Sequence, residues 1–359
     1  MSRFSKSVLC SVAVLPIFTL ALTDAHAATT PLTGAEALSQ FNLITLGNVN
    51  SNSHVDGRAW IGGSVNGGDY VQHVGSTPGS DYAGLTVMGS ANNVHVNGLG
   101  SYIGGSLTNS IVNSGSSYIG GAVGNSNLNG ASYVAGGSSG TNFNGPRLST
   151  PSALIQSNAS AAASTNFGNT LSTLSNTLKG AVANSTVSVV GNKATFNAVA
   201  NSKGVAVFDL SNATSASVFS AGEFSFAANG ASTIIINSSV SSAVIGANFL
   251  GGQAQSLGKS IVWNFYNATS LTINNQFGGS ILATRASLTN NQNIEGGVFV
   301  NSLTQNGELH LQAFTGNLAS VAPVPEPEEY LLMVAGLVLV VGAAALRRRR
   351  IVASGMLAA

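Results

Sequence analysis

Short apolar segments, separated by glycine and small polar residues, recur through the first half of the chain. An apolar segment followed by glycine repeats at residues 60–65, 87–90, 102–107, 118–123 and 133–137. Equivalent apolar residues, Val87, Ile103, Ile119 and Val134, follow one another after 16, 16 and 15 residues. A repeat this short cannot bury its own apolar side chains, but stacked copies bury them together as parallel strands. The first half is therefore predicted to form a parallel β-helix, or β-solenoid.

Each position of the repeat has a predicted place on such a solenoid. Val, Ile and Leu would form an inner column, and Asn, Ser and Thr would cover the outside. The glycine pairs suit corners, where the backbone turns tightly or passes through positive φ, and the recurring Asn residues suit a ladder of stacked amides. The aromatic residues are expected to stack in one file, at Trp60, Tyr102, Tyr118 and Tyr133. That file would serve packing, which we favour, or would present a stripe that stacks on carbohydrate.

A helical pattern interrupts the strands between residues 150 and 180. Thr150 and Pro151 make a suitable N-cap and first helical residue, and Gly180 makes a suitable C′ residue. The apolar side chains recur at helical spacing, at Phe167, Leu171, Leu174 and Leu178. We predict one helix, or two with a break near Gly168, that packs along the solenoid or plugs its open end.

Strand patterns return after Val187. Short apolar runs separated by Asn, Gly and Ser occupy residues 205–210, 233–237, 260–266, 271–274, 279–283 and 297–300. A continuous apolar run such as 234–236 is typical of a strand buried on both faces. The second half is predicted to continue the solenoid or to form a sandwich. The predicted fold class is mainly β, a parallel β-helix with a long packed or capping α-helix.

The N-terminus has the pattern of a secretory signal. Two basic residues precede an apolar stretch over residues 8–22. Ala25 and Ala27 then give the small-x-small pattern that signal peptidase cleaves, which makes Ala28 the first mature residue. An uncleaved N-terminal anchor is the alternative. The pattern predicts a signal helix and an exported body.

The C-terminus has the pattern of a membrane anchor. Residues 330–346 form a charge-free run rich in Leu, Val, Ala and Gly. Such a run spans roughly 25 Å as a helix, which a bilayer accommodates by snorkelling or local thinning. Four arginines follow at once, Arg347, Arg348, Arg349 and Arg350. Positive charge beside a span stays in the cytoplasm, so a transmembrane helix is predicted, with the body outside.

A short motif precedes this run, at Pro325, Glu326 and Pro327. Pro-Glu-Pro, then a transmembrane segment, then an arginine cluster resembles the PEP-CTERM sorting signal of exopolysaccharide-producing Gram-negative bacteria. The resemblance implies cleavage near the motif by an exosortase-type processing enzyme, and release to the cell surface or matrix. It covers the tail alone and concerns sorting, not what the body does.

The predicted organisation follows from these boundaries. The segments are a signal peptide (1–27), solenoid repeats (28–149), a helical segment (150–180), a C-terminal β-rich part of the same body (181–316), a Pro/Glu linker (317–329), a transmembrane helix (330–346) and an Arg-rich tail (347–359).

Composition narrows the function classes. Of 359 residues, 44% are hydrophobic and only 7% are charged, against about 25% charged in ordinary globular proteins. A nearly uncharged polar surface argues against nucleic-acid binding, which needs clustered Lys and Arg. Cys10 is the only cysteine and lies in the leader, so the mature body has no thiol for a disulfide, a metal site or a nucleophile.

Stretches of the body are similar to a second family. They lie at residues 41–48, 56–63, 207–210, 279–283, 294–298 and 306–310. These resemble the "choice-of-anchor A" family, bacterial surface proteins with a shared body and varying C-terminal anchors. The resemblance runs from about residue 38 to 314 and implies an adhesive, β-helical body with no established catalytic residues. The family's proline after Ala283 is absent here, where Thr284 stands instead.

Candidate chemistry in the body is sparse. Its acidic residues are Glu36, Asp56, Asp69, Asp81, Asp209, Glu223, Glu295 and Glu308. Their spacing places no pair on one face, as a polysaccharide-cleaving enzyme would need, so no catalytic residue, cofactor or metal site is predicted. Asp56 and Arg58 are expected to form a local salt bridge or turn cap.

The histidines add two further expectations. Glu308 and His310 would share a face of a strand, as a metal or acid–base dyad or as a polar contact on a terminal rung. The other histidines of the body, His54, His73 and His95, are isolated along the sequence, and His95 is expected to face solvent. Asp69 and Asp81 lie in Gly-rich segments that suit Ca²⁺, but they do not follow the nonapeptide Ca²⁺ repeat.

Three functions remain open. The leading prediction is a non-catalytic surface or matrix protein that adheres to exopolysaccharide or cell-surface glycans, with avidity replacing single-site affinity. The second is a polysaccharide lyase or hydrolase on the same scaffold. The third is ice binding, which needs regular Thr-x-Thr ranks that the first-half repeats do not show.

Overall fold

The computed structural model describes residues 30–211 and 214–321. The predicted signal cleavage site, sorting motif, transmembrane run and arginine cluster lie outside the described residues. In the part described, no helix is long and apolar enough to cross a membrane.

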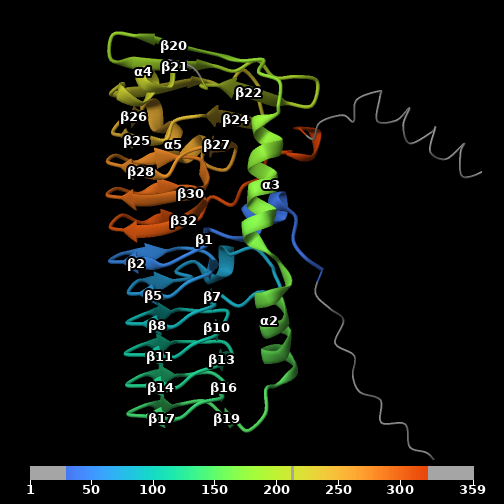
Figure 1. The fold of residues 1–359 in the computed structure, drawn as a ribbon, viewed down its shortest axis with the longest axis vertical. Coiled ribbons are helices and arrows are strands. Elements are labelled where there is room, and N and C mark those ends of the chain that lie inside the picture. The colour runs from blue at the N-terminus through green and yellow to red at the C-terminus, as the bar shows by residue number, and fades with distance from the viewer. Residues whose placement is uncertain (1–29, 212–213, 322–359) are drawn as a thin grey trace, which may run out of the picture.

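The described strands form a β-solenoid, as predicted for the first half, and this solenoid has three faces (Figure 1). Each early rung contributes one short strand to each face. The strands of the first face are β1 (Leu43–Thr45), β4 (Ala59–Ile61), β7 (Leu85–Val87), β10 (Ser101–Ile103), β13 (Ser117–Ile119), β16 (Ser132–Val134) and β19 (Arg147–Leu148). Those of the second face are β2 (Val49–Ser51), β5 (Val65–Asn66), β8 (Ala91–Asn92), β11 (Leu107–Thr108), β14 (Val123–Gly124) and β17 (Ser138–Ser139). Those of the third face are β3 (His54–Val55), β6 (Asp69–Tyr70), β9 (His95–Val96), β12 (Ile111–Val112), β15 (Asn127–Leu128) and β18 (Asn142–Phe143), and the 3₁₀ turn η1 (Val74–Ser76) follows β6.

Three helices cover the first face. They are α1 (Gly34–Gln40), α2 (Ala153–Ser164) and α3 (Phe167–Lys179). In Figure 1, α2 and α3 run along the solenoid and carry the chain from one end to the other. The helical segment therefore packs along the body and does not plug its end.

Details of the helix prediction need correction. Ser152, not Thr150, caps α2 and accepts a hydrogen bond from the Ile155 amide. Two helices form, and the break lies at residues 165–166, because the Asn166 side chain caps α3 by accepting from Asn169 N. Gly180 is the C-cap in right-handed conformation (φ −76°), not a C′ residue in left-handed conformation.

The second half of the chain continues the solenoid from the opposite end. An antiparallel hairpin, β20 (Thr186–Val190) and β21 (Lys193–Asn197), lies at that end. The strands that follow are β22 (Val205–Asp209), β23 (Glu223–Ala227), β24 (Thr233–Ser238), β25 (Ser242–Ile245), β26 (Asn248–Phe249), β27 (Ile261–Phe265), β28 (Ser270–Ile273), β29 (Phe277–Gly278), β30 (Ser280–Asn290), β31 (Ile294–Glu295), β32 (Val298–Gln305) and β33 (Leu309–His310). Short helical elements interrupt them at α4 (Thr214–Ser220), η2 (Leu250–Gly252) and α5 (Gln253–Leu257), and η3 (Ala319–Val321) ends the described chain.

The two halves meet at a seam in the middle of the solenoid. Strand β1 pairs in parallel with β4 on one side and with β32 on the other, so Leu43 lies between Ala59 and Val298. The Asn42 amide joins the same rungs, because it donates to the Gly296 carbonyl at 3.0 Å. The first rung of the chain is thus an inner rung of the molecule (Figure 1).

The inner column of the repeat is confirmed. Ile103, Ile119 and Leu107 are fully buried in a core cluster that runs through both halves. A second apolar cluster lies between the first face and the helices, and includes Trp60 and Phe167. Burying both sides of the first face explains why β24 is buried along its whole length and carries the continuous apolar run 234–236.

The aromatic file forms only in part. Tyr102 and Tyr118 stack with ring centroids 5.0 Å apart, and Tyr133 follows at 5.6 Å. Thr86 separates Trp60 from this file, so including Trp60 was wrong. Trp60 instead packs on Phe167 at 4.8 Å beneath the helices. The file lies on the helix-covered face, which favours packing over carbohydrate stacking.

In the repeat, the pairs Gly104–Gly105 and Gly120–Gly121 are needed for close approach, not for positive φ. A Cβ on Gly104 would lie 2.4 Å from the Met88 carbonyl oxygen of the preceding rung. The backbone has positive φ at a different corner of the rung. Asparagine occupies that corner, with φ of 55° at Asn93, 52° at Asn109 and 50° at Asn125. Asparagine is among the few residues with a side chain that tolerate this conformation.

Candidate functional site

Regular ranks of polar side chains cover the second face near the seam. Three successive rungs present Ser, Thr and Asn outward at alternate positions, at residues 270, 272 and 274, at 287, 289 and 291, and at 302, 304 and 306. Strand pairing places the three serines in one row and the three threonines in another. Leucines between them point into the core. We call this surface the ladder face.

Hydrogen bonds between rungs hold the ladder face in register. Ser302 donates to Ser287 at 2.9 Å. The Asn291 amide donates to Asn274 at 2.8 Å, and Asn306 donates to Asn291 at 3.0 Å. Asn52 then donates to Asn306 at 3.3 Å, which carries the row across the seam. Neighbouring rungs are about 4.8 Å apart and alternate residues of a strand about 7 Å apart, so the face is a two-dimensional grid of hydroxyl and amide groups.

Sequence reasoning missed these ranks. It looked for them in the regular repeats of the first half, where the expected amide ladder does form: Asn113 donates to Asn97 at 2.9 Å, and Asn144 donates to Asn129 at 2.7 Å. The second-half rungs vary in length, and the available signal was the recurring tripeptide Ser-Leu-Thr at 270–272, 287–289 and 302–304.

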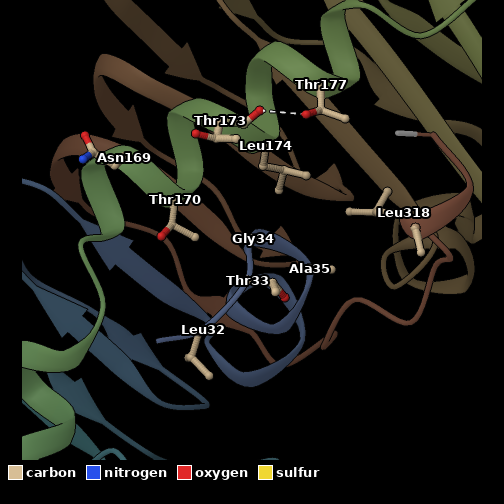
Figure 2. Close-up of a pocket in the computed structure, with 11 residues that line it drawn as sticks. Leu32, Thr33, Gly34, Ala35, Asn169, Thr170, Thr173, Leu174, Thr177 and Leu318 are labelled. Atoms are coloured by element: carbon tan, nitrogen blue, oxygen red, sulfur yellow. Dashed lines mark hydrogen bonds between the residues drawn. The ribbon is translucent and has the colours of Figure 1, made fainter. Parts of the chain in front are cut away.

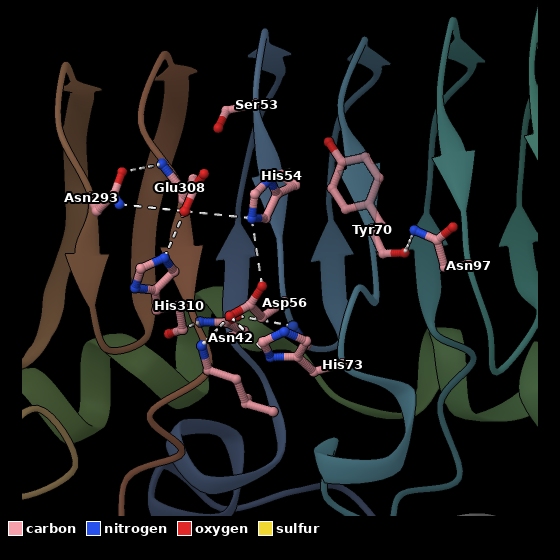
Figure 3. Close-up of polar contacts among 12 residues, drawn as sticks. Asn42, Ser53, His54, Asp56, Tyr70, His73, Asn97, Asn293, Glu308 and His310 are labelled. Carbon is pink, nitrogen blue, oxygen red and sulfur yellow. Dashed lines mark hydrogen bonds and ion pairs between the residues drawn. The ribbon is translucent and has the colours of Figure 1, made fainter. Parts of the chain in front are cut away.

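A cluster of histidines and carboxylates occupies the third face at the seam (Figure 3). His310 lies between two carboxylates, with its Nδ1 2.7 Å from Glu295 and its Nε2 2.7 Å from Glu308. Across the seam, His54 Nε2 lies 3.6 Å from Glu308 and 3.7 Å from Asp56. We call these groups, with the three that follow, the seam cluster.

The seam cluster extends to the next rungs. His73 Nδ1 lies 3.3 Å from Asp56, and His95 Nδ1 lies 3.0 Å from Asp69. Strand pairing puts His54, Asp69 and His95 in one row on β3, β6 and β9. Every histidine between residues 30 and 321 therefore lies beside a carboxylate on this face.

Several expectations about these residues were wrong. The acidic residues are not all scattered, since the seam cluster gathers four of them. His54, His73 and His95 are not isolated, because each lies beside a carboxylate. The Arg58 guanidinium makes no ion pair with Asp56, because it is buried and donates to the carbonyl oxygens of Gln40, Pro78 and Tyr82.

Two expectations about the histidines hold. Glu308 and His310 share a face and a hydrogen bond, as the sequence predicted. His95 is half-exposed, in line with a solvent-facing position. Asp81 lines a different pocket from Asp69, so the two do not converge on one cation. In the described ranges, no three His, Cys, Asp or Glu side chains are arranged to hold a metal ion.

Two groups of the seam cluster, Glu308 and His310, have pKa values shifted toward their charged forms. The hydrogen bond from His310 lowers the pKa of Glu308, with His54 and His310 adding attraction. For His310, burial lowers the pKa, but the hydrogen bonds with Glu308 and Glu295 outweigh it and the net pKa is raised. Glu295 is almost fully buried and also accepts from Gln276 at 2.7 Å. The two carboxylates therefore favour the protonated form of the His310 imidazole that lies between them.

One hollow lies at these surfaces and another lies at the helices that cover the first face. An open polar groove of about 520 Å³ follows the corner between the second and third faces and is lined by Asn52, His54, Asp69 and Glu308 among others. An apolar pocket of about 570 Å³ lies between α1, α3 and the segment at Leu318 (Figure 2). The polar groove joins the seam cluster to the ladder face, because Asn52 belongs to both the groove and the amide row.

Comparisons with known proteins agree with an adhesive body. A family model described as "Putative Ice-binding-like adhesive domain" matches residues 34–311. A solved structure described as "Crystal structure of ice binding protein from an Antarctic bacterium Flavobacteriaceae" is 12% identical, over 78% of this chain and 98% of that chain, with a TM-score of 0.23. That likeness is too distant to support an argument. A search of curated proteins finds no match.

Proposed function

Because the chain belongs to the ice-binding-like adhesive domain family, we propose that this adhesive surface protein binds exopolysaccharide or cell-surface glycans through its ladder face. The observation that carries the proposal is the grid of Ser, Thr and Asn side chains in three consecutive rungs. Each hydroxyl or amide gives a weak hydrogen bond, and many such bonds on one repeating polymer add up through avidity. No catalytic role is part of this proposal.

Variants of the threonine row test the ladder face. Replacing Thr272, Thr289 and Thr304 together by Val removes three hydroxyls and keeps β-branched shape. We expect binding of the full chain to extracted exopolysaccharide to weaken by at least about tenfold, since each lost hydrogen bond contributes about 1 kcal/mol.

A matched control removes the same number of hydroxyls elsewhere. Thr170, Thr173 and Thr177 belong to α3, which covers the first face, and they line the apolar pocket there, away from the ladder face. Their replacement by Val should leave binding unchanged. Equal affinity of the ladder-face variant and the native chain would contradict the proposal.

The proposal includes export and anchoring. The order of Pro-Glu-Pro, apolar run and arginine cluster supports a PEP-CTERM signal, and the body supports a choice-of-anchor A protein. Signal peptidase would act at the N-terminus and an exosortase at the C-terminus, in a Gram-negative inner membrane. The segment boundaries from the sequence belong to the same proposal.

Fractionation tests the sorting tail. Cells producing the full chain should hold the body in the membrane and surface fractions. A chain truncated after residue 324 should lose membrane association. An identical distribution of the two chains would reject the tail as a sorting signal.

Two alternatives each have an observation in their favour. The first alternative is a polysaccharide-cleaving enzyme, because the seam cluster brings four carboxylates and histidines together and acid–base cleavage uses such groups. Release of new reducing ends from exopolysaccharide tests this activity. The Ser-x-Thr ranks suit ordered water or ice, and inhibition of ice recrystallisation, lost in the triple Thr→Val variant, tests that.

A further inference from the structure

Strand β20 is the outermost strand at the end of the solenoid that the hairpin closes (Figure 1). It pairs with β21 and with no other described strand, so it forms one edge of its four-stranded sheet. An edge strand presents unpaired backbone N–H and C=O groups, and such an edge is a template for pairing with another chain. Strand β20 is therefore a candidate interaction surface.

The pairing of the hairpin shows which groups of β20 are free. Ala198, directly after β21, donates its N–H to the Ala227 carbonyl oxygen of β23 at 2.9 Å. Backbone groups alternate in direction along a strand, so even-numbered residues of β21 bond to β23 and odd-numbered ones bond to β20. The odd-numbered residues of β21 lie opposite the even-numbered residues of β20. The N–H and C=O groups of Val187 and Val189 therefore point away from β21, toward the open edge.

Neighbouring strand edges at this end of the solenoid are covered. The Asn184 side chain protects the outer edge of β22, because it accepts from Val207 N at 2.7 Å and donates to Val205 O at 3.1 Å. Helix α4 lies against β25, whose strand partner is β28. In the part of the chain that the structure describes, no residue outside the hairpin forms a hydrogen bond with Val187 or Val189. The edge of β20 is thus left open.

The opposite end of the solenoid has a protected edge. Its last rung carries Pro146 and Arg147, and the Arg147 guanidinium lies 4.7 Å from the centre of the Phe143 ring. Proline and charge are devices that prevent an edge from pairing. Strand β20, with the sequence Thr-Val-Ser-Val-Val, has neither. The side chains beside it are apolar as well, since Val190 is 75% and Val182 86% exposed.

The open edge is complementary to itself. An antiparallel pair of two copies centred on Ser188 places Val187 of each copy opposite Val189 of the other. These are the residues whose N–H and C=O groups point outward, so each Val187–Val189 pair exchanges both of its backbone hydrogen bonds. No like charges meet, because β20 is uncharged and the charge of the hairpin, Lys193, lies on β21. A second copy therefore satisfies every free group of the edge through one two-fold axis.

We propose that β20 pairs antiparallel with β20 of a second copy and joins two solenoids end to end in a closed dimer. The two-fold axis passes beside Ser188, and the sheet of β20 and β21 continues from one copy into the other. The ladder face and the seam cluster of both copies stay open, because they lie in the middle of the solenoid and not at its end (Figure 1). The dimer does not depend on the proposed glycan adhesion.

Disulfide trapping tests the pairing in the full chain. Cys10 is the only cysteine, so Cys10→Ser makes an introduced thiol unique. Ser188→Cys then places two thiols opposite each other in a non-hydrogen-bonded pair with Cα atoms about 4.5 Å apart, a distance that a disulfide spans. Oxidation of the purified chain should give a covalent dimer on non-reducing electrophoresis. Ser139→Cys, on the exposed strand β17 of the opposite end, should give less than about a tenth as much, because collisions do not hold that geometry.

Sedimentation of the full chain in a mild detergent tests association without a cross-link. The native chain should be dimeric at micromolar concentration. Ser188→Lys should weaken association at least about tenfold, because two ammonium groups would meet at the axis. Residue 188 is exposed, so the lysine is compatible with the folded monomer. Ser139→Lys makes the same charge change at the opposite end and should leave association unchanged.

The two measurements give clear outcomes. A Ser188→Cys dimer that forms in preference to the Ser139→Cys dimer, together with weaker association of Ser188→Lys alone, supports the pairing. Equal disulfide formation at the two positions overturns the inference, and so does its absence at residue 188. A monomeric native chain, or a Ser188→Lys chain that associates as tightly as the native one, also overturns it.

Discussion

Removing the imidazole of His310 should destabilise the seam by a measurable and pH-dependent amount. His310→Ala deletes two hydrogen bonds of 2.7 Å, to Glu295 and Glu308. The Glu295 carboxylate is only 2% exposed and would keep only Gln276 as its side-chain partner. A buried charge that loses its partner costs roughly 2–3 kcal/mol. The Glu308 bond adds little, because that side chain is 39% exposed and becomes hydrated.

The sign of the pH dependence follows from the two shifted pKa values. The raised pKa of His310 gives stability that is complete below about pH 6.5 and is lost as pH rises through the folded value. The lowered pKa of Glu308 gives stability that is present above its ordinary value of 4.5 and is lost on acidification. The penalty of His310→Ala should therefore be largest between about pH 5 and 6.5, and smaller at pH 9 and at pH 3.

Urea denaturation followed by circular dichroism and by tryptophan fluorescence measures the penalty. Adding Glu295→Gln to His310→Ala should recover part of it, because the buried group is then uncharged. His95→Ala removes a more exposed partner of Asp69 and should cost less than about 0.5 kcal/mol. A His310→Ala penalty as small as that of His95→Ala, or one that does not change with pH, would refute this account of the seam.

Two further predictions concern the body. Gly104→Ala should lower the free energy of unfolding by about 2 kcal/mol or more, because the new Cβ would meet the Met88 carbonyl oxygen. Gly137→Ala, whose Cβ would have no atom within 4 Å, should change the free energy of unfolding by less than about 0.5 kcal/mol. Equal effects of the two substitutions would contradict the close-approach argument. Arg58→Met should cost about 2–4 kcal/mol, since three carbonyl oxygens lose a buried charged donor; a melting temperature equal to that of the native chain would show that water replaces the guanidinium.

The sequence was informative where contacts are close along the chain. The repeat of 15 to 16 residues predicted the parallel strands, and the helical stripe from Phe167 to Leu178 predicted the buried side of α3. The N-cap of α2 was predicted wrongly, because Thr150 and Ser152 are both good N-cap residues and the helix begins after Ser152.

The seam could not be predicted in the same way. It joins residues about 254 positions apart, such as Asn52 and Asn306, and no local pattern specifies which rung follows which. The seam cluster depends on that joint, because His54 reaches Glu308 only after β3 and β33 become neighbours. The charged residues therefore looked scattered along the chain although they meet in space.

Binding of the native chain and of its ladder-face variant to the exopolysaccharide of the producing cells tests the central claim most directly. The account predicts that the native chain and the α3 triple variant are retained equally on immobilised polysaccharide. Loss of the Thr272, Thr289 and Thr304 hydroxyls should lower retention at least about tenfold, with circular dichroism unchanged. Equal retention of all three chains would contradict the claim that this face is the adhesive surface.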